Sequence, residues 1–446
     1  MLTRQLVSEF DHFTIGFSAV AGWSIAAYLF SVAIVLTQRA NRFTFVIILT
    51  VMIVCRLVTL FPDPYLSSDV YRYAWDGVVQ HAHISPYRYV PGDPALSFLR
   101  APNQDLFDNI NRRDYAHTIY PPVAQILFYL ITFINPTVVF MKTVMILFEG
   151  LTMYALVAFL REMGVVRERT ILYAWCPLLI WEIGSSGHLD SAVMAFMALA
   201  LLARYRKQPI LTGLFLGLAV MTKMYPLVLF PALYRRGDYK MPATLVSVIA
   251  SGYLAYCSVG LGVFGFLGGY VQEEGISRGT RYFLLELAQH VPGMHSLSTT
   301  TLLLFSAAIF ITLIVWCWRN YCLFPSTELA SVSIRTFGLP ANAAFLVPAF
   351  CLALTLMLLF SPHYPWYIAW LMPFLVLVPN LTVLTYVCAF FYLCTTALAV
   401  GSGPLQFLLN KILYACILIA MVAEGAILQS KLKASQAKFP YKRSST

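Results

Sequence analysis

Long apolar runs recur through this 446-residue chain and exclude a water-soluble fold. A run of about 20 apolar residues crosses the hydrocarbon core of a bilayer as one helix. Charged residues make up 11% of the chain, against about 25% in soluble domains. The sequence therefore predicts a single integral membrane domain over residues 1–446, an all-α polytopic bundle of about 11 to 13 transmembrane helices.

Lysines and arginines cluster in short loops between the apolar runs, near residues 161–169, 204–207 and 235–240. Membrane proteins hold such residues on the cytoplasmic side, and this explains the net charge of +10 without an anionic polymer partner. The same assignment sends the polar segments to the opposite side of the membrane. These segments are 62–122, 185–190, 268–298 and 361–366.

Two apolar segments are too short or too broken to be ordinary spans. Val123 to Ile134 is closed by Asn135-Pro136, which predicts a half-helix or re-entrant piece. The segment 209–234 is interrupted from Thr222 to Pro226. We expect a hairpin of short helices there, with its break at membrane depth.

Segment 62–122 is the one long polar stretch of the chain, and we expect an outer catalytic loop with amphipathic helices there. Asp69, Arg72, Tyr73 and Asp76 recur at i, i+3, i+4 and i+7, so they share one face of a helix. Ser67 or Ser68 would cap this helix. A carboxylate beside an arginine can serve as a general base. The alternative is a solvated loop whose tyrosines and tryptophan form an interfacial belt.

Three further polar groups are expected on the same face of the membrane. Gly187-His188-Leu189-Asp190 could contribute to a site or simply begin a helix. Lys223 lies in an apolar hairpin, where an ionisable residue indicates function unless it snorkels to the interface. His363 lies between two prolines and beside Tyr364 and Trp366, where it is either a positioned imidazole or part of an aromatic anchor.

Several common signatures are absent from the sequence. There is no glycine-rich phosphate loop and no zinc-binding His-Glu pattern. The nine cysteines lie in or beside apolar runs, with no disulfide or metal-ligand spacing. We therefore expect no cofactor and an activated substrate that comes from the membrane, while a metal requirement stays open.

Several short motifs, taken in order, resemble the GT-C superfamily of integral membrane glycosyltransferases. Within it, the chain is most similar to the bacterial polyprenyl-phosphate-mannose-dependent α-mannosyltransferases, over most of residues 60–380. One departure is His83-Ile84-Ser85-Pro86-Tyr87, where relatives often have Gly-x-Asn-Pro-Tyr. The motifs are Asp69 to Gly77, Pro86-Tyr87, Tyr120-Pro121-Pro122, Gly187 to Asp190, Lys223 to Pro226 and Tyr364 to Tyr367.

The resemblance implies an inverting transfer of a hexose, with mannose expected, from a polyprenyl phosphate to a lipid or glycan acceptor. The family's catalytic aspartate matches Asp69, and His363 would support it. We expect the donor phosphate to bind Lys223, Tyr225, Arg278 and Arg281. The expected substrate-binding residues are Arg72, Tyr73, Asp76, Tyr87, Tyr120, His188, Asp190, Tyr364 and Trp366.

The expected location is the bacterial cytoplasmic membrane, with the site facing the periplasm or the cell exterior. Two other functions compete with this one. A polyprenol-sugar or lipid flippase would spread polar residues through the depth of several spans, often with internal repeats, whereas here they gather at one face. A non-catalytic subunit of an envelope assembly would tolerate the loss of Asp69.

Overall fold

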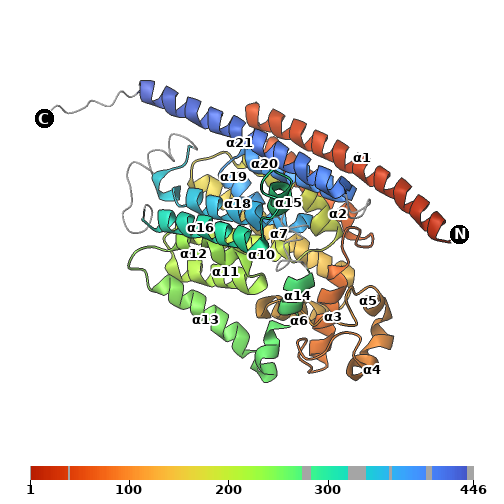
Figure 1. Cartoon of the computed structure of the whole chain (residues 1–446). Helices are drawn as coiled ribbons and strands as arrows, with labels where there is room; N and C mark the ends of the chain where they lie inside the picture. Colours follow the sequence, from red (N-terminus) through yellow and green to blue (C-terminus); the bar gives the residue numbers. More distant parts are fainter. Residues whose placement is uncertain are drawn as a thin grey trace.

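The computed structural model describes residues 2–38, 41–273, 283–319, 338–360, 364–397 and 404–438. Over these ranges the chain forms helices and no strand (Figure 1). This confirms the predicted all-α polytopic class. The helical class follows from the apolar composition. An apolar segment lies in the bilayer, and there a helix satisfies every backbone hydrogen bond within its own segment.

Five described helices are long and apolar enough to cross a membrane, and two bent helix pairs would raise the number to seven. The predicted count of about 11 to 13 spans is reached only if the shorter apolar helices also cross. The five long helices are α1 (Leu2–Thr37), α7 (Val138–Glu162), α16 (Thr299–Cys317), α18 (Leu346–Phe360) and α21 (Pro404–Lys438).

The shorter elements fill the space between these helices or follow the polar segments. The apolar ones are α2 (Thr44–Leu60), α6 (Pro122–Ile134), α11 (Pro209–Thr222), α19 (Met372–Leu377) and α20 (Leu381–Ala397). The others include α3 (Asp69–His81), α4 (Ser97–Arg100), α5 (Gln104–Asp108), α8 (Ile171–Ala174), α12 (Phe230–Leu233), α14 (Leu267–Glu273) and α15 (Phe283–Gln289).

The two predicted short pieces are present in the structure. Helix α6 has 13 residues and ends before Asn135. Helix α11 ends at Thr222, and Lys223 has extended backbone angles before a 3-10 turn, η5 (Tyr225–Leu229). The predicted break at Lys223 is therefore confirmed, and it turns this side chain out of the helix.

One bent pair shapes the centre of the bundle. A short helix, α9 (Pro177–Leu179), continues as a π-helical turn, η4 (Ile180–Ser185), and meets α10 (Asp190–Tyr205) at an angle of 119°. Gly187 lies at the bend with φ of +69°, and a Cβ atom there would press on the side chains of Lys142 and Val70. The bend carries His188 and Asp190 into the interior.

The other bent pair breaks the apolar run that follows the basic loop at 235–240. Helix α13 (Lys240–Leu254) meets the segment Cys257–Gly269, which begins with the 3-10 segment η6 (Cys257–Phe264), at an angle of 109°. Gly260 has φ of +55°, which a regular helix excludes. At the bend the hydroxyl of Tyr256 donates to Oε1 of Gln80 at 2.8 Å. This hydrogen bond joins the bend to α3.

A buried ion pair joins α2 to α7. Arg56 donates to both carboxylate oxygens of Glu149, at 3.1 and 3.0 Å, and also to the carbonyl of Ala174. Both side chains are almost fully excluded from solvent. A buried charge is stable only when it is paired and hydrogen-bonded, so this pair holds the two helices in a single register.

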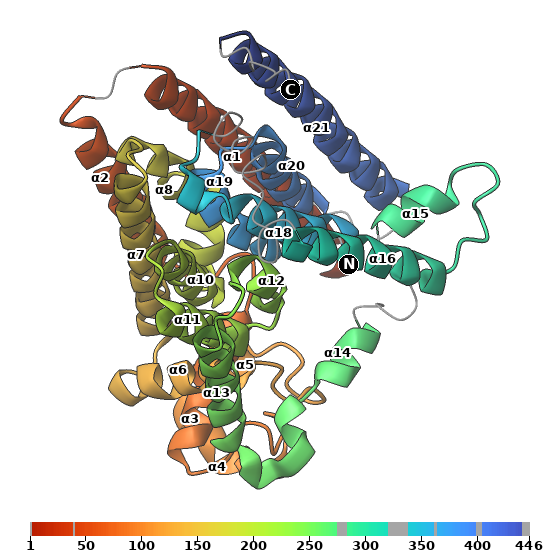
Figure 2. The same ribbon diagram turned by 90° about the vertical axis from the view of Figure 1, so that its left-hand side faces the viewer.

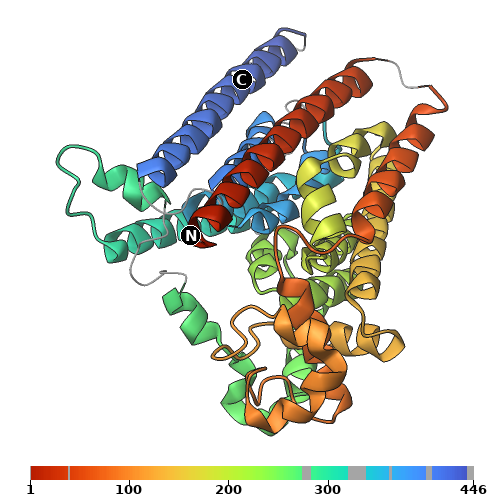
Figure 3. The same ribbon diagram turned by 90° about the vertical axis from the view of Figure 1, so that its right-hand side faces the viewer.

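Helices α3, α4, α5 and α6 gather at one end of the molecule, with α14 beside them (Figure 2). Helices α1 and α21 run along the outer edge of the bundle (Figure 3), and α20 contacts both. Segment 268–298 includes the described helix α15, so it is partly helical. Its assignment and that of 62–122 to the outer side remain predictions.

Candidate active site

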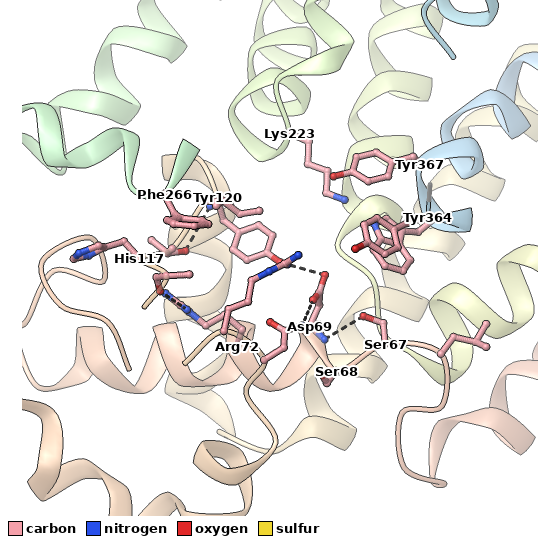
Figure 4. A pocket seen from close by; sticks show the side chains of 17 residues that line it. Ser67, Ser68, Asp69, Arg72, His117, Tyr120, Lys223, Phe266, Tyr364 and Tyr367 are labelled. Atoms are coloured by element: carbon pink, nitrogen blue, oxygen red, sulfur yellow. Dashed lines mark hydrogen bonds between the residues drawn. The ribbon is translucent and has the colours of Figure 1, made fainter. Parts of the chain in front are cut away.

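A cavity of about 420 Å³ opens where the start of α3, the chain at 111–120, Lys223 and the turn at 364–367 meet (Figure 4). Polar and aromatic groups alternate around it. Its lining consists of Leu66, Ser67, Ser68, Asp69, Arg72, Asn111, Arg112, Ala116, His117, Thr118, Ile119, Tyr120, Lys223, Phe266, Tyr364, Trp366 and Tyr367.

The first turn of α3 presents Asp69 to this cavity. Ser68 occupies the N-cap position without a side-chain cap, while Ser67 accepts a hydrogen bond from the Asp69 amide at 3.2 Å. The sequence predicts that Ser67 or Ser68 caps this helix. Ser67 is the serine whose side chain accepts a hydrogen bond from a backbone amide at the start of the helix. The place of Asp69 in the first turn puts its carboxylate at the N-terminal end of α3.

Two side chains from distant parts of segment 62–122 hold the Asp69 carboxylate (Figure 4). Asn111 donates to Oδ1 at 2.9 Å, and the hydroxyl of Tyr120 lies 3.4 Å from Oδ2. Each oxygen therefore has one partner and keeps lone-pair capacity for another donor. A substrate hydroxyl can be that donor.

Arg72 lies one turn further along α3. Its Nε donates to Asp76 at 2.7 Å and its Nη1 to the carbonyl of Ala116 at 3.0 Å. Gln125 donates to the other oxygen of Asp76 at 2.9 Å. Nε and Nη1 of Arg72 therefore fix the guanidinium beside the cavity, while the buried Nη2 atom has no hydrogen-bond partner among the described residues.

Lys223 enters the cavity from the end of α11. Its Nζ donates to Oδ2 of Asp190 at 2.5 Å, and Tyr225 donates to Oδ1 of the same carboxylate at 3.0 Å. The Tyr367 ring lies 5.1 Å from Nζ. Asp190 is fully buried and Lys223 is not. The acid therefore anchors the ammonium group at the cavity wall, where it can still meet an anion.

Three aromatic rings are stacked at the side of the cavity. The ring centroids of Tyr364 and Trp366 are 4.5 Å apart, and those of Trp366 and His188 are 4.1 Å apart. Behind them, Glu182 in the π-helical turn lies 3.3 Å from Nε2 of His188, and both side chains are fully buried. Glu182 thus lies close behind the stack, although neither its carboxyl oxygens nor the His188 nitrogens have a hydrogen-bond partner among the described residues.

Three tyrosines of segment 62–122 are buried and remain neutral phenols. Burial raises the pKa of Tyr73, Tyr87 and Tyr120 well above the ordinary value. Tyr73 stacks on Phe128 at 4.7 Å, and Tyr87 donates to the carbonyl of Tyr120 at 2.7 Å. These contacts fix the chain that carries Tyr120.

The predicted site residues fall into four groups. Those that line the cavity are Asp69, Arg72, Tyr120, Lys223, Tyr364 and Trp366. Those directly behind its wall are His188, Asp190 and Tyr225. Those packed away from it are Tyr73, Asp76 and Tyr87. Those outside the described residues are His363, Arg278 and Arg281.

The residues at this site that sequence reasoning missed include Asn111, Arg112, His117, Phe266 and Glu182. Asn111 to His117 form a polar run just before Tyr120, so a signal was present in the sequence. An acid inside the apolar run around Glu182 was a second signal. Phe266 gave none, because its place depends on Gly265, where any Cβ would collide with the Thr118 carbonyl.

Among the side chains that the structure describes, no three or more from His, Cys, Asp and Glu converge as a metal site. The acids at the cavity are instead paired with organic cations or amides. The described residues thus place a carboxylate opposite cationic and aromatic groups.

The N-terminal domain model of the α-(1→6)-mannopyranosyltransferases matches residues 4–235. The matched region includes Asp69, Asp190 and Lys223, and it ends before Tyr364 and Trp366. Comparison with curated proteins and with solved structures finds no match. Because the matched region is more than half of the chain, this protein belongs to the α-(1→6)-mannopyranosyltransferase family, and its predicted resemblance to membrane mannosyltransferases is confirmed.

Proposed function

We propose that this mannosyltransferase moves mannose from a polyprenyl phosphate to the 6-hydroxyl of a lipid or glycan acceptor, with inversion at the anomeric carbon. The observation that carries the proposal is the shared cavity of Asp69 and Lys223, a carboxylate base and an anchored cation. A transfer from a sugar phosphate needs a base that accepts the proton of the incoming hydroxyl. It also needs a cation that stabilises the outgoing phosphate.

Asp69 acts on the acceptor. Its carboxylate takes the hydroxyl proton as the acceptor oxygen bonds to the anomeric carbon. Asn111 and Tyr120 hold the carboxylate in one orientation, so the base need not reorient during the reaction. General base catalysis of this kind contributes about 10²- to 10⁴-fold in rate.

Cationic groups receive the leaving phosphate. The bond from the anomeric carbon to the phosphate oxygen breaks with its electron pair on oxygen, which leaves a polyprenyl phosphate with added negative charge. Lys223, Arg72 and Arg112 all line this cavity. Such fixed positive groups stabilise the charge that develops in the transition state.

The aromatic stack suits the sugar. Tyr364 and Trp366 present ring surfaces at the cavity. The C–H face of a pyranose packs on such a surface, and the amphipathic ring of tryptophan offers large contact area. The stack would orient the mannosyl group between Asp69 and Lys223.

The distribution of basic residues supports action at the outer face. Helix α10 begins at Asp190 beside the cavity and ends at Tyr205, before Arg206 and Lys207. Its 16 residues span about 24 Å at the helical rise of about 1.5 Å per residue. The cavity and this basic loop therefore lie at opposite ends of α10, and basic loops mark the cytoplasmic side.

Donor choice tests the proposal. Purified protein in detergent is supplied with polyprenyl-phosphate-[14C]mannose or with GDP-[14C]mannose, each with a mannosylated lipid acceptor. We expect labelled product with the polyprenyl donor alone, with an α-(1→6) linkage by linkage analysis. Transfer from GDP-mannose alone would contradict the donor assignment, and donor binding without transfer would favour a flippase.

A further inference from the structure

A second cavity, of about 280 Å³, lies at the other end of α10 and α11 from the mannosyl-transfer cavity. Helix α10 leaves the first cavity at Asp190, and α11 returns to it at Lys223. The second cavity is bounded by the turn that joins these helices and by the loop before α13. The two helices lie side by side (Figures 1 and 2), so the cavities are separated by the length of α11, about 21 Å.

The second cavity is strongly basic. Arg204, Lys207, Arg235 and Arg236 line it, together with one acid, Asp238. The Asp238 carboxylate accepts the backbone amides of Lys240 and Met241 at 3.0 and 3.2 Å, so it is engaged in capping the start of α13. The other four charged side chains that line the cavity are cations, so the ligand that fits it is an anion.

The position of one of these cations is set by the fold. Arg204 donates through Nε to the carbonyl of Leu233 at 2.7 Å, and its guanidinium lies 4.8 Å from the centroid of the Phe345 ring. Partial burial lowers the pKa of Arg235, while nearby Asp238 raises it. Neither Lys207 nor Arg235 forms an ion pair within the described ranges. The side chains of Lys207 and Arg235 can thus receive a charged ligand.

The surroundings of this cavity are apolar. Ile210 and Leu211 follow Pro209 on α11 and are 54% and 38% exposed, and Tyr239 before α13 is 72% exposed. On a helix bundle in a bilayer, exposed apolar side chains contact acyl chains. A basic pocket next to such a surface, on the side rich in lysine and arginine, fits an anionic lipid headgroup.

We propose that this cavity is a phosphate-binding site, separate from the transfer site, that takes the phosphate of an anionic phospholipid at the opposite membrane surface. Arginine forks bind phosphate oxygens by paired hydrogen bonds, and lysine adds a point charge. Free inorganic phosphate has the same chemistry, and the experiment separates the two sources. The site would hold the turns at 206–209 and 234–239 together and so stabilise the hairpin that carries Lys223.

The test uses the full chain in neutral detergent and follows thermal unfolding. Phosphatidylglycerol, phosphatidylcholine and inorganic phosphate are added separately to wild type, to Lys207→Gln/Arg235→Gln and to Arg161→Gln. Arg161 is an exposed arginine at the end of α7 that does not line the cavity, so it controls for loss of charge. Unliganded midpoints and gel-filtration profiles confirm that each variant is folded.

We expect phosphatidylglycerol to raise the unfolding midpoint of wild type and of Arg161→Gln by several degrees more than phosphatidylcholine does, and the double variant to lose this difference. A rise with inorganic phosphate alone, lost in the same variant, would support the site with a soluble anion as its ligand. Equal midpoints with all three additives in wild type would overturn the proposal. So would a phosphatidylglycerol effect that the double variant keeps. If the double variant fails to fold, Lys207→Gln alone replaces it, because Lys207 is exposed.

Discussion

Lys223 and Asp190 form a direct ion pair, with 2.5 Å between Nζ and Oδ2, although 33 residues separate them along the chain. Asp190 begins α10, and Lys223 follows the last residue of α11. The ion pair therefore joins the start of α10 to the end of α11. It also leaves the ammonium group at the cavity where we place the donor phosphate.

Replacing Lys223 by glutamine should weaken the use of the lipid donor. A charge-assisted hydrogen bond contributes about 1.5–3 kcal/mol, so kcat/KM for the polyprenyl donor should fall about 10- to 100-fold. Lys223→Arg should retain part of the activity. Lys431→Gln, an exposed lysine on α21, is the matched control. Donor kinetics of Lys223→Gln equal to those of Lys431→Gln would remove Lys223 from the phosphate site.

Asn111 should act by positioning Asp69. Without the 2.9 Å hydrogen bond from Asn111, the carboxylate can rotate away from the acceptor, and we expect Asn111→Ala to lower kcat about tenfold. The KM for the donor should stay the same, because the side chain contacts the base and not the phosphate. Asn109→Ala is the control, since the side chain of Asn109 donates to the Asp105 carbonyl. A changed donor KM with an unchanged kcat would show a different role for Asn111.

Trp366 should contribute binding through its ring. Trp366→Ala removes the middle member of the stack with His188 and Tyr364, and Trp366→Phe keeps an aromatic surface there. A stacked aromatic pair contributes about 0.5–1.5 kcal/mol beyond area burial. We expect the KM for the donor to rise several-fold in the alanine variant and to recover in the phenylalanine variant. Equal losses in the two variants would exclude stacking as the cause.

The buried pair of Arg56 and Glu149 should matter for stability more than for catalysis. Glu149→Gln leaves the Arg56 guanidinium as an uncompensated buried charge, with an expected cost of about 3–5 kcal/mol. The double variant Arg56→Met/Glu149→Met removes both charges and should be closer to wild type. Thermal unfolding in detergent measures both. The loss of stability in the double variant is compared with the sum of the losses in Arg56→Met and Glu149→Met. If the two are equal, the pair itself, and not its isolated charge, sets stability.

Local patterns predicted those parts of the structure that depend on near neighbours in the chain. The start of α3 follows from its serines and from the recurrence of Asp69, Arg72 and Asp76 on one face, and the ion pair of the last two confirms this face. The break at Lys223 follows from a proline three residues later and from a lysine in an apolar run.

Contacts between segments far apart in the chain could not be predicted from local sequence patterns. Asn111 lies 42 residues from Asp69, and no local period relates them. Asp76 is also an aspartate of α3. Its carboxylate nevertheless accepts hydrogen bonds from Arg72 and Gln125, because the fold brings those two donors to it. At the bend after Leu254, Tyr256 donates to Gln80, which lies 176 residues away in the chain, so no local pattern relates the two residues.

The most direct test of the account replaces Asp69 by asparagine and measures mannose transfer from polyprenyl-phosphate-[14C]mannose. Asparagine keeps the size and the hydrogen-bonding reach of the side chain but cannot accept a proton. Asp105→Asn, on the exposed helix α5, is the matched control. We predict a loss of about 10²- to 10⁴-fold in kcat for Asp69→Asn with donor binding intact, and normal turnover for Asp105→Asn. Transfer by folded Asp69→Asn at the rate of wild type would contradict the assignment of Asp69 as the base.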